Sequence, residues 1–218
     1  MSEELTITAV DGLALEAVLD EAGDPGALAV VLCHPHPRMG GTMKAPLLLA
    51  LRDELVGRGW PVLRFNFRGV GASAGTAGTG IDEVSDALGA LVWARRRFPG
   101  AAVALAGWSF GAAVALRAAA LAPEVAAVVA IAPAVTERPG ITAGLPPAQE
   151  LALVRPLLVV AAANDKLSPP AECERWAKAA GARYEVVAGA NHFFWARYEQ
   201  LATLVTGFLA GIQGGGKA

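Results

Sequence analysis

The sequence predicts an α/β protein: a mostly parallel sheet of about eight strands with an antiparallel N-terminal hairpin and helices on both faces. Short, uniformly apolar runs alternate with helix-length segments, which is typical of parallel strands buried on both faces. The length of 218 residues suits one continuous core, and 54% hydrophobic residues exclude disorder for most of the chain. We therefore expect one domain over residues 1–212, followed by a flexible, glycine-rich tail at 213–218.

The predicted elements follow one another in a regular order. Asp11-Gly12, between the β-prone runs 5–9 and 13–19, predicts a tight hairpin. Further strands are expected at residues 28–33, 61–65, 103–106, 125–131, 157–162 and 184–187. Helices are expected at residues 46–56, 81–97, 112–121, 171–180 and about 192–209. In such a sheet, ligands bind at the carboxyl ends of the strands.

The charge and the apolar content of the chain limit its partners. A formal net charge of −2 and a pI near 5.9 provide no basic field for a polyphosphate backbone, so no nucleic-acid partner is expected. The apolar stretch 101–133 is broken by Arg117, Pro123 and Glu124, which indicates a buried strand–helix–strand unit and no membrane partner. The acidic N-terminus lacks the features of a secretory signal, which favours a cytoplasmic location. The sequence predicts no particular oligomeric state.

No cofactor or metal is expected. Cys33 and Cys173 form neither a metal motif nor a disulfide framework, so we interpret both as reduced, structural residues. The run 68–75 superficially resembles a dinucleotide-binding loop, but its third glycine comes too late and no helix follows. We interpret it as a tight loop anchored by Arg68.

The five residues 107–111, Gly-Trp-Ser-Phe-Gly, connect a strand-like run to a helix-forming one. A serine at such a turn is held in a strained conformation, and the flanking Gly107 and Gly111 allow neighbouring backbone to approach closely. The helix that begins there directs its free N–H groups towards negative charge developing beside Ser109. The context predicts that Ser109 is a nucleophile.

A base and an acid for Ser109 are found further along the chain. Of the three histidines only His192 follows the serine, and it lies between the last predicted strand and the last helix. Asp165 follows the strand 157–162 and precedes His192 by 27 positions (192 − 165). The order Ser, Asp, His at strand ends predicts a catalytic triad.

His192 and Asp165 also have alternative interpretations. An isolated histidine in a loop is more often a hydrogen-bonded structural residue, and Asp165 has Lys166 as a neighbouring ion-pair partner. Rival acids are present on the predicted helix 81–97, where carboxylates usually form a solvated face or support the helix N-terminus. These rivals are Asp82, Glu83 and Asp86.

Two backbone N–H groups are candidates to bind an oxyanion. One belongs to Phe110, directly after the nucleophile, and the other is expected in the loop after the third strand. There, Pro35 and Pro37 have no N–H and stiffen the backbone, so we assign the second donor to the N–H of His36. A metal bound by His34 and His36 is the alternative, but no third ligand lies nearby in the sequence.

Four motifs together resemble the α/β-hydrolase superfamily, and the resemblance extends from the opening hairpin to the last helix. They are Cys-His-Pro-His-Pro with Gly-Gly, Phe-Asn-Phe-Arg-Gly-Val-Gly, Gly-Trp-Ser-Phe-Gly-Ala and Gly-Ala-Asn-His-Phe-Phe. More narrowly, they resemble small, lidless bacterial serine hydrolases related to dienelactone hydrolases and prolyl-oligopeptidase domains. This resemblance implies an α/β-hydrolase fold, the triad Ser109, Asp165 and His192, and the oxyanion donors His36 and Phe110.

The chain also departs from those families. Dienelactone hydrolases typically have a cysteine nucleophile where this chain has Ser109, which argues against dienelactone as the substrate. The segment 132–155 has room for one short helix, so no substantial cap is expected.

The function expected from these features is that of a carboxylesterase, which cleaves small-molecule, short-chain acyl esters through an acyl-enzyme. The cleft should be open, with Met39, Trp108, Phe193 and Phe194 in contact with substrate and Trp195 beside it. The alternatives are a thioesterase or small-peptide hydrolase and, from another class, a non-catalytic binding module on the same fold.

Overall fold

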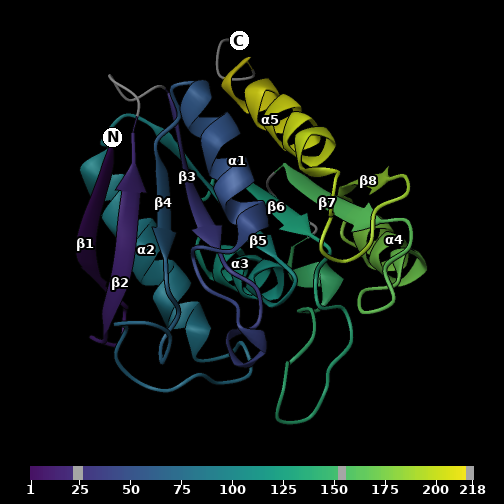
Figure 1. Ribbon diagram of the computed structural model, residues 1–218, viewed down its shortest axis with the longest axis horizontal. Helices are drawn as coiled ribbons and strands as arrows, with labels where there is room; N and C mark the ends of the chain where they lie inside the picture. The colour runs from purple at the N-terminus through teal and green to yellow at the C-terminus, as the bar shows by residue number, and fades with distance from the viewer. Residues whose placement is uncertain (22–26, 152–155, 215–218) are drawn as a thin grey trace.

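The computed structural model describes residues 1–21, 27–151 and 156–214. Within them, eight strands form one sheet in the order β1-β2-β4-β3-β5-β6-β7-β8 (Figure 1). The first two strands and β4 pair antiparallel, and all the other neighbours pair in parallel, as the sequence predicts. The strands are β1 (Ser2–Thr8), β2 (Ala14–Asp20), β3 (Leu28–Cys33), β4 (Val62–Phe65), β5 (Ala102–Trp108), β6 (Ala127–Ile131), β7 (Leu157–Ala162) and β8 (Arg183–Val187).

Helices cover both faces of the sheet, and each face has its own apolar core. One core contains side chains of α2 (Glu83–Arg97), α3 (Phe110–Leu121) and α4 (Pro170–Ala179). The other contains side chains of α1 (Pro46–Gly57) and α5 (Tyr198–Gly214). Successive residues of β3 enter opposite cores. The central strands are uniformly apolar because both of their faces are buried.

The last helix begins later than predicted. It begins at Tyr198 and not near residue 192, and a series of turns precedes it. Phe194 and Ala196 have φ angles of 53° and 57°, in the left-handed region that an α-helix excludes. At its other end α5 extends to Gly214, two residues into the segment predicted as a tail, whose residues 215–218 lie outside the described chain.

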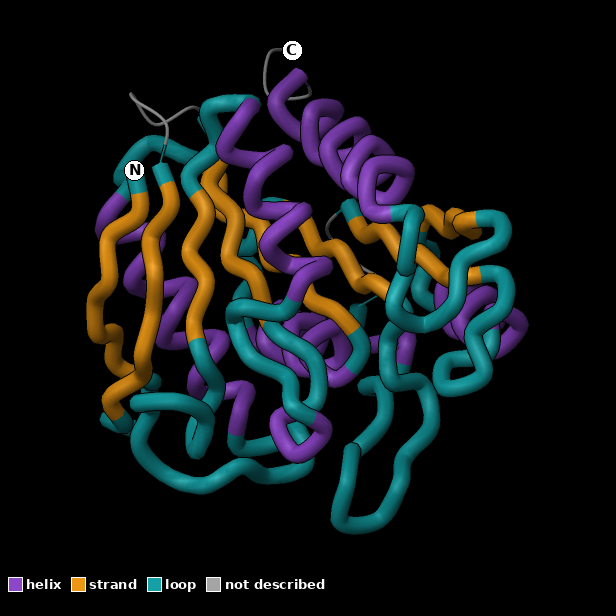
Figure 2. The backbone as a smooth tube through the Cα atoms, in the orientation of Figure 1, coloured by secondary structure: helices purple, strands orange, loops and turns teal. Residues whose placement is uncertain are grey.

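The loops at the carboxyl ends of the strands gather along one edge of the sheet (Figure 2). The longest joins β6 to β7 and contains a narrow hairpin, in which Arg138 pairs with Thr142, and one 3₁₀ turn at Ala148–Glu150. No cap-sized helix occurs in the described part of this loop. Among the described helices, none is long and apolar enough to cross a membrane.

Candidate active site

Ser109 lies at the sharp turn between β5 and α3. Its φ and ψ angles of 56° and −115° are strained for a residue with a side chain, and its N–H donates to the carbonyl of Ile131 at 2.8 Å. Gly107 and Gly111 have to be glycines because neighbouring backbone atoms leave no room for a Cβ. A Cβ at Gly107 would lie 2.3 Å from the Gly111 oxygen, and a Cβ at Gly111 would lie 2.3 Å from the Cys33 oxygen. The turn therefore packs tightly against the end of β3 and holds the serine in place.

His192 connects Ser109 to Asp165. Its Nε2 lies 3.1 Å from the Ser109 Oγ, and its Nδ1 lies 2.7 Å from Asp165 Oδ2. The other carboxylate oxygen of Asp165 accepts the backbone N–H groups of Leu167 and Ser168, each at 2.8 Å. Because an ionised carboxylate only accepts hydrogen bonds, Nδ1 carries the proton and Nε2 is left as the acceptor that faces the serine.

The backbone of His192 is also fixed. The indole Nε1 of Trp108 donates to the His192 carbonyl at 3.1 Å, so the residue before the serine positions the loop that carries the histidine. The Trp108 ring also meets Phe193 edge-on, with 6.0 Å between centroids. Two consecutive residues at the end of β5 thus serve the site: Trp108 orients the loop of His192, and Ser109 follows it at the turn.

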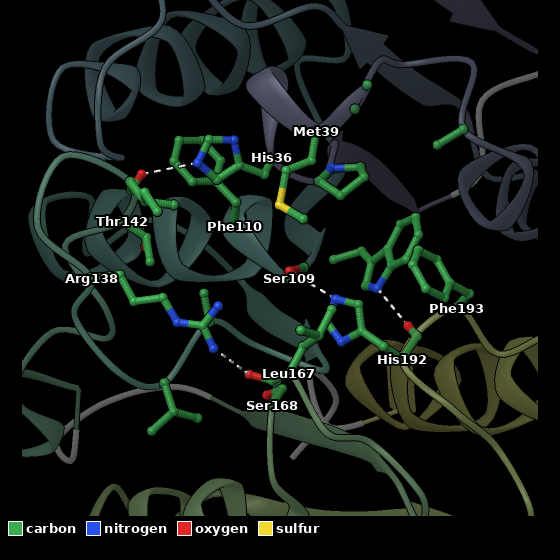
Figure 3. Close-up of a pocket in the computed structure, with 18 of the residues that line it drawn as sticks. His36, Met39, Ser109, Phe110, Arg138, Thr142, Leu167, Ser168, His192 and Phe193 are labelled. Atoms are coloured by element: carbon green, nitrogen blue, oxygen red, sulfur yellow. Dashed lines mark hydrogen bonds between the residues drawn. The ribbon is translucent and has the colours of Figure 1, made fainter.

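The loop after β3 brings His36 to the same cavity as Ser109 and Phe110 (Figure 3). No described group accepts a hydrogen bond from the His36 N–H, and the Phe110 N–H is the first of α3 and has no intrahelical acceptor. The His36 ring stiffens this loop. Its Nδ1 accepts the Arg38 N–H at 3.1 Å, so its Nε2 carries the proton and donates to the Ile141 carbonyl at 3.0 Å.

His34 has a structural place in that loop. Its Nδ1 donates to the Pro35 carbonyl at 2.6 Å and its Nε2 accepts the N–H of Phe67 at 3.0 Å, which joins the loop to the end of β4. Burial lowers the pKa of His34 to about 4, so the ring is neutral near pH 7. Both ring nitrogens are occupied, and the described residues contain no cluster of three potential metal ligands.

A cavity of about 290 Å³ opens above Ser109. Met39, Trp108 and Phe193 line it, as do the two histidines His36 and His192. The β6–β7 loop forms another part of the wall with residues that the sequence analysis missed, because no periodic pattern marks that loop. These include Arg138, Ile141 and Thr142.

One residue expected in the cavity lies elsewhere. The side chain of Phe194 is fully buried in the core beneath α5 and does not line the cavity. The positive φ at Phe194 turns the chain inwards directly after Phe193, which is why two adjacent phenylalanines point in different directions. Trp195 stacks on Phe193 at 5.0 Å between centroids and is largely exposed outside the cavity wall.

A family model described as serine aminopeptidase, S33, matches residues 27–155. The chain belongs to this family of α/β serine hydrolases. A solved α/β serine hydrolase homologue from Coxiella burnetii is 30% identical, covers 93% of this chain and 95% of its own, and superposes with a TM-score of 0.82. A serine hydrolase without a lid from Xanthomonas campestris is 29% identical, with coverages of 96% and 94% and a TM-score of 0.81.

The family and these structures confirm the fold class, including the missing lid.

A curated relative, an uncharacterized protein of Rickettsia prowazekii, is 38% identical over 122 residues. This match covers 56% of the chain and 51% of the relative, so the chain spans about half the length of the curated relative that it matches.

Two of the rival acids in this S33-family chain are not on a solvated face. Glu83 and Asp86 are fully buried at the start of α2. Glu83 accepts the N–H groups of Gly78 and Gly80 at 2.6 and 2.9 Å, and Asp86 pairs with Arg68 at 2.6 Å. The expectation of a solvated face is wrong for both residues because their partners come from the loop before the helix.

Proposed function

We propose that this protein is a serine carboxylesterase that cleaves small acyl esters through an acyl-enzyme. The observation that carries the proposal is the continuous hydrogen-bonded chain from Asp165 through His192 to Ser109, at 2.7 and 3.1 Å. Ser109 and His192 line an open cavity. A nucleophile, a base and an orienting carboxylate in this relation are what acyl transfer through serine requires.

In the proposed reaction, His192 Nε2 removes the hydroxyl proton as Ser109 Oγ attacks the acyl carbon. The N–H groups of His36 and Phe110 donate to the oxyanion, which contributes about 10²- to 10³-fold in rate for each donor. The protonated His192 then gives its proton to the leaving alcohol, and a water molecule activated by the same nitrogen releases the acid. Asp165 stabilises the imidazolium and keeps the proton on Nδ1.

Ester chemistry is favoured over aminopeptidase chemistry by the charge of the cavity. A peptide substrate presents an α-ammonium group, which proteins bind with a carboxylate. None of the described residues that line the cavity is Asp or Glu, and Asp165 is occupied by His192. The volume of about 290 Å³ is at the small end for ligand sites, which favours a short acyl group.

The test is hydrolysis of p-nitrophenyl esters from acetate to octanoate, with fluorophosphonate labelling of the purified protein. We expect turnover that is best for short chains, and a loss of about 10⁶-fold in kcat with loss of labelling in Ser109→Ala. Acyl-CoA thioesters and aminoacyl amides, assayed in parallel, separate the two alternative hydrolase activities. No turnover of any ester together with no labelling would overturn the proposal and leave a binding module.

A further inference from the structure

One charged side chain lines the cavity without belonging to the proposed triad or oxyanion site. It is Arg138, which begins the narrow hairpin between β6 and β7. The walls near it are contributed by apolar or uncharged side chains, including Ile141, Thr142 and Leu167. Arg138 is exposed, so water hydrates the parts of its guanidinium that no protein group binds, and an anionic ligand in the cavity can replace that water.

No carboxylate in the described part of the chain forms an ion pair with Arg138. It takes part in none of the ion pairs, and its guanidinium makes a single long hydrogen bond of 3.4 Å to the Leu167 carbonyl. Its neighbour Glu137 interacts electrostatically with Arg117, and the nearby Glu172 accepts the hydroxyl of Thr136 at 3.0 Å. At least four of the five guanidinium N–H groups therefore have no acceptor among the described residues.

The hairpin fixes the backbone of Arg138. Its backbone exchanges hydrogen bonds with Thr142 at 2.8 and 3.0 Å. Arg38 donates to the Gly140 carbonyl at 2.8 Å, and the His36 ring binds the Ile141 carbonyl at 3.0 Å, so the hairpin is tied to the oxyanion loop. A site held by rigid neighbours loses less entropy when it binds a ligand.

Arg138 and His192 lie on different sides of Ser109 in the view of Figure 3, and Phe193 is on the side of His192. The alcohol that leaves must face His192 Nε2 to receive its proton. The acyl group therefore extends away from His192, towards the guanidinium.

We propose that Arg138 selects acyl groups that end in a carboxylate, so that the preferred substrates are half-esters of short dicarboxylic acids. The proposal rests on the esterase function proposed above. Water cleaves the ester bond to give the dicarboxylate, the free alcohol and one proton. The guanidinium pairs with the distal carboxylate, which does not react, in the bidentate manner that arginine favours.

The experiment uses monomethyl esters of malonate, succinate, glutarate and adipate, each matched with the methyl ester of the monocarboxylic acid of equal chain length. Proton release in a pH-stat gives kcat/KM for both members of a pair. We expect the wild type to prefer the half-ester at one chain length, and Arg138→Met to reduce that preference by about 10- to 100-fold. Arg138→Lys should keep part of it, because lysine binds carboxylates as a point charge.

Arg96→Met is the matched control. It removes the same charge from an exposed position in the last turn of α2, outside the cavity, and should leave the preference unchanged. Equal losses for charged and neutral esters in Arg138→Met would mean a purely structural role and would overturn the inference. An Arg138-dependent preference seen only when the carboxylate is on the alcohol, as in 4-acetoxybenzoate, would overturn the placement on the acyl side.

A binding measurement separates this inference from the esterase proposal. Calorimetry of succinate and glutarate with Ser109→Ala, with and without Arg138→Met, needs no turnover. Binding that depends on Arg138 supports the anion site even if no ester is hydrolysed, whereas no Arg138-dependent binding of either dicarboxylate counts against it. Turnover of neutral esters without any effect of Arg138 leaves the esterase proposal intact and removes only this one.

Discussion

The two oxygens of Asp165 have different partners, and this difference determines the proton position on His192. Oδ1 accepts two backbone N–H groups from Leu167 and Ser168, and Oδ2 accepts the proton on His192 Nδ1. The two backbone donors can only be satisfied by an oxygen at the first position. Any replacement side chain must therefore keep its acceptor there.

This geometry makes Asp165→Asn a sharp test of the triad. The amide oxygen has to face the two backbone donors, so its NH₂ group faces His192 Nδ1, which must then become an acceptor. The proton moves to Nε2, where it prevents the ring from taking the proton of Ser109. We expect kcat to fall about 10⁴-fold with little change in melting temperature. Asp82→Asn, at an exposed position, is the control, and a loss of less than tenfold in Asp165→Asn would contradict the assignment.

At the scale of elements, the loop between β3 and α1 folds back on itself at one glycine. The N–H of Gly41 donates to the His36 carbonyl at 3.0 Å, and a Cβ at Gly41 would lie 2.1 Å from the Pro35 oxygen. Backbone atoms on both sides leave no room for a side chain. The position of the His36 N–H therefore depends on Gly41.

We expect Gly41→Ala to displace that N–H and to lower kcat by about 10²- to 10³-fold, the cost of losing one oxyanion donor. Slower fluorophosphonate labelling should accompany the loss, because the same donors stabilise the phosphonylation transition state. Gly207→Ala in α5 is the control: a Cβ there meets nothing within 4 Å, and stability should rise by about 0.5–1 kcal/mol. Unchanged kcat in Gly41→Ala would contradict the role of the His36 N–H as an oxyanion donor.

Sequence patterns predicted elements well where burial is regular. The bounds of β3 and β7 agree with the apolar runs 28–33 and 157–162, because both faces of these strands are covered. The start of α5 was missed, since the composition of residues 192–197 does not reveal the left-handed conformations of Phe194 and Ala196. The cavity wall around Arg138 was missed for a related reason: a hairpin held by long-range hydrogen bonds has no local signal.

For the whole molecule, the alternation of apolar runs predicted the sheet, and the chain order of three residues predicted which side chains would meet. The structure does bring Ser109, Asp165 and His192 into one hydrogen-bonded chain. These sequence patterns could not predict which residues pair with the buried charges. Arg68 was expected to anchor its loop, but its pairing with Asp86 depends on how α2 packs against the sheet, and patterns of single residues do not contain that information.

Arg68 joins three distant parts of the fold. It follows β4, donates to Asp86 on α2 at 2.6 and 3.0 Å, and reaches Asp11 in the β1–β2 turn at 2.7 Å. Asp86 is fully buried, whereas 41% of the Asp11 side chain is exposed. Because an unpaired charge is costly only where water is excluded, the two carboxylates should differ greatly in their effect on stability.

We expect Asp86→Ala to lower the free energy of unfolding by about 3–5 kcal/mol, because it leaves the Arg68 guanidinium buried without its main partner. Asp11→Ala should cost less than about 1 kcal/mol, since water replaces the exposed carboxylate. Urea denaturation of both variants measures the difference. The loss of stability in Asp86→Asn should fall between the losses of the two alanine variants. This variant keeps an acceptor for the backbone N–H of Arg68, which lies 2.9 Å from Asp86 Oδ2, but it removes the negative charge. Equal losses in the two alanine variants would show that Arg68 is held by the exposed turn as strongly as by the buried helix.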